Sequence, residues 1–175
     1  MTASGCGVFV KEYGYLLQND PGYAAKARRI SELTKDLVEV IEVEDLTSLA
    51  GNLDCGPRVA YQSSCTLQHG QKLAGRVEAL LRALGFTLTP VPDAHLCCGS
   101  AGTYSLLQPD MSERLRESKL TALASGTPDL IVTANIGCLA HLQGGPHEGS
   151  PSAGTALPVV HWAQLLDPEG LGSLG

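Results

Sequence analysis

The chain has 175 residues, of which 43% are hydrophobic and 17% charged, a make-up that suits one globular domain with its own apolar core. Its net charge of −6 and its scattered Lys and Arg residues leave no basic stripe for phosphates, so we expect no nucleic-acid partner. Apolar runs are shorter than the ~20 residues that span a bilayer, and the amino terminus lacks a signal-peptide pattern. We therefore expect a cytoplasmic protein.

Helical and strand patterns alternate in the first half of the chain. Apolar residues recur at helical spacing over residues 21–43, which predicts one long amphipathic helix. The short apolar run at residues 58–62 predicts a strand, and residues 71–84 predict the next helix. Residues 87–92 have a weaker strand pattern, whose prolines favour an edge position.

The second half continues the alternation after a turn of small residues at 97–103. The expected elements are helices at 104–108 and 111–124, a buried strand at 129–134, and a last strand from Val159 with a short helix at 162–166. This order predicts an α/β fold, with a doubly wound, Rossmann-like parallel sheet covered by helices on both faces. Ligands of such sheets gather at the carboxyl ends of the strands.

The six cysteines are more readily explained as metal or redox ligands than as disulfides, because the cytoplasm is reducing. Gaps of roughly 30 to 40 residues separate Cys65, the adjacent Cys97 and Cys98, and Cys138, which excludes a zinc finger or a ferredoxin run. Loops at one sheet edge could bring these four thiols together. Soft thiolates favour an iron-sulfur cluster or zinc.

One cysteine is excluded from the ligand set, and no catalytic motif is found in the sequence. Cys55 stands apart from this pattern and is interpreted as a small buried side chain outside the site. The spacing shows no catalytic triad, no paired carboxylates and no dinucleotide fingerprint, so we expect that the chain alone is not catalytic.

Five segments of the chain are similar to one family. Together they resemble the CCG cysteine-rich domain of heterodisulfide reductases and of lactate- and glycolate-oxidising systems, most specifically glycolate oxidase iron-sulfur subunits. The segments are TASGCGVFVKEYG at 2–14, SCTLQHGQKL at 64–73, PDAHLCCGSAGTYSLLQP at 92–109, TANIGCLAHLQ at 133–143 and PVVHWAQLLD at 158–167.

The resemblance implies a CCG-type site that binds an iron-sulfur cluster, with zinc as the alternative metal. Its ligands would be Cys65, Cys97, Cys98 and Cys138. His141 stands where the fuller motif has a further cysteine and could close the site, or could lie outside it. Cys6 matches the last cysteine of a preceding CCG half and is a further candidate ligand.

A short internal similarity bears on domain organisation. Residues 2–6 resemble residues 133–138, which implies that residues 1–20 are the tail of a truncated first CCG repeat. Residues 21–175 would then be a second CCG domain, with a flexible loop at 144–157. Because the partner strands of the first repeat are not encoded here, we expect residues 1–14 to be the least well anchored part.

The resemblance implies an electron-transfer subunit of a glycolate oxidase or dehydrogenase, an oxidoreductase complex. The subunit would pass electrons from flavin-containing subunits to a quinone or another membrane acceptor, and the complex would bring it to the membrane. A separate polypeptide could supply ferredoxin clusters and the first CCG half, or a second copy could form a homodimer. Two alternatives remain: a zinc-stabilised structural or interaction module, and a thiol-disulfide protein that cycles Cys97 and Cys98.

Overall fold

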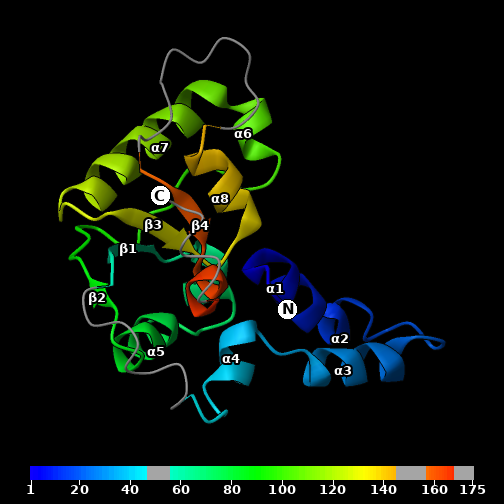
Figure 1. The fold of residues 1–175 in the computed structure, drawn as a ribbon. Coiled ribbons are helices and arrows are strands. Elements are labelled where there is room, and N and C mark those ends of the chain that lie inside the picture. Colours follow the sequence, from blue (N-terminus) through cyan, green and yellow to red (C-terminus); the bar gives the residue numbers. More distant parts are fainter. Residues whose placement is uncertain (47–55, 145–156, 168–175) are drawn as a thin grey trace.

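The structure, a computed structural model, describes residues 1–46, 56–144 and 157–167 and contains a parallel four-stranded sheet (Figure 1). The strand order is β2-β1-β3-β4, and the register places Val59 of β1 opposite Leu88 of β2 and Leu130 of β3. The expected α/β fold is confirmed. The strands are β1 (Arg58–Gln62), β2 (Thr87–Leu88), β3 (Leu130–Thr133) and β4 (Val159–His161).

Helices connect the strands and extend the chain at its amino-terminal end. Helices α1, α2 and α3 lie together beside the sheet rather than over one of its faces (Figure 1). The helices are α1 (Ser4–Lys11), α2 (Tyr13–Leu16), α3 (Ala24–Leu33), α4 (Leu37–Ile41), the π-helical turn η1 (Thr66–Gly70), α5 (Arg76–Ala83), α6 (Tyr104–Leu107), α7 (Pro109–Ala124), α8 (Ile136–Leu142) and the 3₁₀ turn η2 (Trp162–Leu166).

Each face of the sheet buries its own apolar cluster, as the alternation of strand side chains requires. Val59 and Val132 pack with α5 and η2 on one face, where Trp162 is fully buried. Ala60 and Ile131 point to the other face and pack with side chains of α7 and α8. Helices therefore cover both faces.

The connections reverse direction between two neighbouring strands, β1 and β3. The chain leaves β1 through α5 to reach β2 on one side, and it leaves β3 through α8 to reach β4 on the other. Such a switch point leaves a crevice beyond the carboxyl ends of the two strands, where doubly wound proteins bind their ligands.

The single helix predicted over residues 21–43 is wrong. It is divided into α3 and α4 because Asp36 forms a capping box: its carboxylate accepts from the Val38 amide at 3.3 Å, and its own amide donates to Glu39 at 2.8 Å. The apolar residues Ile30 and Leu33, expected on a buried face, are 46% and 59% exposed.

Residues 1–14, expected to be the least well anchored part, contact the rest of the chain at several points. The amino-terminal ammonium donates to the Lys35 carbonyl at 2.7 Å, and the Leu37 amide donates to the Met1 carbonyl at 2.9 Å. The Ser4 side chain is fully buried. Phe9 and Tyr15 nevertheless remain 55% and 73% exposed, so the segment is fixed through its backbone and its first turn.

Two further expectations concern the loop at residues 144–157 and the domain boundary at residue 20. Most of the predicted flexible loop, residues 145–156, lies outside the described residues. The division of the chain at residue 20 stays a prediction. In the part of the chain that the structure describes, no helix is both long enough and apolar enough to cross a membrane.

Candidate metal centre

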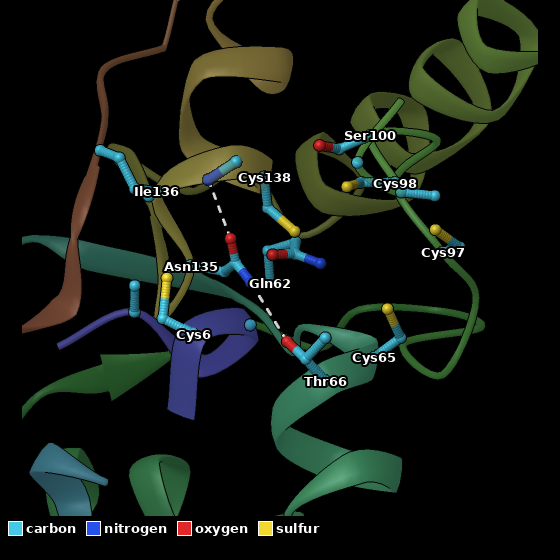
Figure 2. A pocket seen from close by; sticks show the side chains of 15 residues that line it. Cys6, Gln62, Cys65, Thr66, Cys97, Cys98, Ser100, Asn135, Ile136 and Cys138 are labelled. Carbon is cyan, nitrogen blue, oxygen red and sulfur yellow. Dashed lines mark hydrogen bonds between the residues drawn. The ribbon is translucent and has the colours of Figure 1, made fainter. Parts of the chain in front are cut away.

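The four cysteines predicted as ligands come together at the carboxyl ends of the strands (Figure 2). Cys65 follows β1, and Cys138 lies in the first turn of α8, directly after β3. Cys97 and Cys98 lie in the loop that follows β2. All four line one cavity of about 390 Å³ at the switch point, and Cys6 of α1 lines it too.

A glycine with positive φ shapes the loop that carries the adjacent cysteines. Gly99 has φ +94°, and a side chain there would collide with the Ser112 carbonyl of α7. The close approach is fixed by the Ser112 hydroxyl, which donates to the Gly99 carbonyl at 2.9 Å. The Cys97 sulfur accepts a hydrogen bond from the Gly99 amide at 3.3 Å. Glycine is therefore needed for the chain to turn Cys97 and Cys98 toward the cavity.

Helix α8 is held against the cavity by its cap, Asn135. The side-chain Oδ1 of Asn135 accepts from the Gly137 amide at 2.8 Å. The side-chain nitrogen of Asn135 donates to the hydroxyls of Ser4 and Thr66, each at 3.1 Å (Figure 2 shows the bonds to Gly137 and Thr66). One side chain thus links the start of α8, the turn after β1 and the start of α1. This places Cys138 at the rim of the cavity.

Cys6 reaches the cavity because α1 docks at the end of β3. The Ser4 amide donates to the Ala134 carbonyl at 3.1 Å, and the Ser4 hydroxyl lies 2.8 Å from the hydroxyls of Ser64 and Thr66. Cys6 is the third residue of α1, as Cys138 is of α8. The two similar sequence segments therefore present equivalent thiols to the same cavity.

Burial and mutual interactions raise the pKa values of three of the thiols, Cys65, Cys97 and Cys98. A hydrogen bond with Cys98, together with burial, raises the pKa of Cys97 well above the ordinary thiol value. A hydrogen bond with Cys138, together with burial, raises the pKa of Cys98 to about 12. Burial and the negative charge of Cys97 raise the pKa of Cys65. Adjacent thiolates form here only when a cation compensates their charge, as a bound metal does.

The other two sequence candidates are placed differently. His141 is buried one turn beyond Cys138, does not line the cavity, and has its Nε2 3.3 Å from the Ser112 hydroxyl. Its carbonyl accepts from Arg116 at 3.4 Å. Cys55 lies outside the described residues.

The donor set suits a group larger than one ion. Among the described residues, no three His, Cys, Asp or Glu side chains converge closely enough to hold a single metal ion. The five cysteines instead surround a cavity, which fits a polynuclear cluster whose irons are bound by different thiolates. Soft sulfur donors match iron-sulfur chemistry.

Sequence reasoning missed the polar residues of the lining, notably Gln62, Thr66 and Asn135. Gln62 is buried and accepts from the Thr133 hydroxyl at 2.5 Å, which joins the ends of β1 and β3 beneath the cavity. Gln62 ends the predicted strand 58–62 and Asn135 directly follows the predicted strand 129–134, so the strand ends were the signal that could have identified these two residues.

The chain is similar to several known proteins. The cysteine-rich domain family CCG matches residues 59–143, which include Cys65, Cys97, Cys98 and Cys138. The chain is 55% identical to the glycolate oxidase iron-sulfur subunit of Escherichia coli over 95% of its own length, but it spans only 38% of that relative. It is 34% identical to lactate utilization protein A of Geobacillus kaustophilus, covering 95% of this chain and 69% of the relative. A probable glycolate oxidase iron-sulfur subunit of Bacillus subtilis is 33% identical over 94% of this chain and 37% of its own length. The family resemblance expected from the sequence is confirmed.

Proposed function

The chain belongs to the CCG cysteine-rich domain family, and on that premise we propose that it holds an iron-sulfur cluster and transfers electrons within an oxidoreductase complex. The observation that carries the proposal is the gathering of thiols around one cavity at the switch point of the sheet. When bound, such a cluster accepts and releases single electrons.

The proposed ligands are Cys65, Cys97, Cys98 and Cys138, with Cys6 as a further thiol donor. The lining supports Cys6 over His141, because Cys6 borders the cavity and His141 faces Ser112 of α7. Thr66 and Asn135 fix the loops that carry these ligands, and Gln62 joins the two strands beneath them.

The lining also supports a carrier role over substrate oxidation. None of the described residues that border the cavity is a His, Asp, Glu, Lys or Arg, and its titratable side chains are the cysteines proposed as cluster ligands. In the proposal, flavin-containing subunits oxidise glycolate and pass electrons to this chain, which passes them to a quinone or another membrane acceptor.

In this proposal the chain is a cytoplasmic subunit, and the complex that contains it associates with the membrane. A separate polypeptide with ferredoxin clusters and a first CCG half is one proposed neighbour, and a second copy of the chain is another. The exposed apolar residues Phe9 and Tyr15 beside the sheet are consistent with a covering partner.

The dithiol alternative receives less support from the geometry. A cycling cysteine pair needs a thiolate of lowered pKa, whereas the pKa values of Cys97 and Cys98 are both raised. The zinc alternative would require ligands that converge on one ion, and the described side chains surround a cavity instead.

A ligand series tests the proposed site. Single serine variants of Cys65, Cys97, Cys98 and Cys138 should each lose most of the iron that the wild-type protein takes up during anaerobic reconstitution, and should melt earlier. Cys6→Ser should lower the iron content, whereas His141→Gln should keep it. Cys55→Ser is the control from outside the proposed ligand set. Iron content equal to wild type in all of the cysteine variants would contradict the assignment.

A spectroscopic experiment tests the proposed electron transfer. Photoreduced FMN, a free flavin donor, should bleach the visible absorption of the reconstituted cluster, and a water-soluble quinone should restore it. A cluster that stays oxidised with excess reduced flavin would reject the carrier role while leaving the metal site intact.

A further inference from the structure

A buried lysine lies behind the loop that carries the adjacent cysteines. Lys119 of α7 is only 3% exposed, and its ammonium donates to the carbonyls of Asp93 and Ala94 at 3.3 and 3.1 Å. These carbonyls belong to the loop that ends in Cys97 and Cys98. Lys119 therefore ties this loop to α7.

Among residues 1–46, 56–144 and 157–167, no carboxylate lies within ion-pair distance of Lys119, although Asp93 borders the same cavity as Lys119 and its negative charge acts on the lysine. Arg116, one helical turn earlier on α7, is equally buried but pairs with Glu113 at 2.6 Å. Burying an ammonium against carbonyl oxygens alone costs free energy, so a buried lysine kept in this way points to a negative charge nearby.

Two sources of negative charge lie near Lys119: the carboxylate of Asp93 and the thiolates of the proposed cluster. Lys119 and Cys97 line the same second cavity, of about 250 Å³, on the α7 side of the loop. Burial lowers the pKa of Lys119, whereas the negative charges of Cys98 and Cys97 oppose that change. Because the Lys119 side chain is buried, its interaction with these charges is screened less than that of a surface lysine.

We propose, on the basis of the iron-sulfur function proposed above, that Lys119 is a positioning residue whose positive charge raises the reduction potential of the cluster. Reduction adds one electron, and hence one negative charge, to the cluster. A buried cation next to the thiolates stabilises this reduced state more than the oxidised state. Arg116 contributes less because its charge is paired with Glu113.

Redox titration of the reconstituted protein with dithionite as the electron donor tests this inference. Lys119→Gln keeps an N–H donor for the loop carbonyls but removes the charge, and it should shift the midpoint potential to a more negative value. Lys119→Arg keeps the charge and should stay near the wild-type potential. Lys26→Gln, which removes a charge from an exposed side chain of α3, is the matched control and should cause no shift.

The outcomes separate this inference from the proposed function. A wild-type potential in Lys119→Gln at full iron content, or an equally negative potential in Lys119→Arg, would overturn the role of Lys119 and leave the cluster in place. Failure of the wild-type protein to bind iron would reject the proposed function itself. If Lys119→Gln does not fold, Lys119→Met replaces it. If neither neutral variant holds iron, alkylation of the metal-free proteins decides: it should be slower than wild type at Cys97, which borders the same cavity as Lys119, and an unchanged rate would refute the charge effect.

Discussion

The backbone amide of Ser4 donates a hydrogen bond of 3.1 Å to the carbonyl of Ala134, so the first helix begins where the central strand β3 ends. Because of this contact, Cys6 and Cys138 border one cavity although they are far apart in the sequence. The Ser4 hydroxyl strengthens the junction through Ser64, Thr66 and Asn135.

Removing that hydroxyl should loosen the amino-terminal segment. Ser4→Ala removes the hydroxyl that bonds the buried Ser64 side chain and two further partners, so we expect the free energy of unfolding to fall by about 1–3 kcal/mol. Hydrogen exchange should become faster at residues 2–14. Ser125→Ala, which removes an exposed hydroxyl bonded only within its own turn, is the control. Unchanged exchange at residues 2–14 would show that Ser4 does not anchor them.

The glycine after the cysteine pair should tolerate no side chain. Gly99→Ala combines positive φ with a collision against the Ser112 carbonyl, and we expect a loss of roughly 2–5 kcal/mol in unfolding free energy. Gly102→Ala has positive φ but open space, so it should lose only about 1–2 kcal/mol. Chemical denaturation compares the two variants. Equal losses would mean that the contact with α7 does not matter.

His161 should make stability depend on pH. Its Nε2 lies 2.8 Å from the Thr2 carbonyl and its Nδ1 accepts from the Ala163 amide, so the neutral ring is required. Burial lowers its pKa below the ordinary value of 6.5. The unfolded chain therefore takes up a proton first as the pH falls, and stability that is complete above about pH 6.5 should decline toward the lower folded-state pKa. Denaturation of wild type and His161→Gln at several pH values gives the unfolding free energy as a function of pH. The slope of that dependence should be shallower for the variant. Identical slopes would exclude His161 as the cause.

The buried hydroxyl of Tyr61 should be dispensable. It is enclosed in the core with no hydrogen-bond partner among the described residues, and burial raises its pKa. Tyr61→Phe removes an unsatisfied polar group, so stability should stay unchanged or rise by about 1 kcal/mol. Tyr15→Phe, at an exposed position, is the control for thermal melts. A marked loss in Tyr61→Phe would reveal a partner for this hydroxyl.

The sequence predicted the sheet well because its inner strands are short, strongly apolar runs. Residues 58–62 coincide with β1, and residues 129–134 contain β3. From the parallel order of the strands it followed that Cys65, Cys97, Cys98 and Cys138 should meet at one edge, and the structure brings them together there.

The features that could not be predicted, helices α1 and α8 and the position of His141, depend on contacts between residues that are far apart in the sequence. Helix α1 contains two glycines, which lower its helix propensity, and it is held in place by the contact of Ser4 with Ala134. Helix α8 was missed because Gly137 weakens its pattern, although Asn135 is a favourable cap. His141 lies about 4.5 Å further along α8 than Cys138, which is enough to move it from the cavity to α7.

Metal analysis after anaerobic reconstitution with ferrous iron, sulfide and an equal amount of zinc distinguishes an iron-sulfur site from a zinc site. We expect a brown protein with broad absorption near ~400 nm, stoichiometric iron and sulfide, and little zinc. A colourless protein that retains zinc without iron would contradict an iron-sulfur site formed by these cysteines.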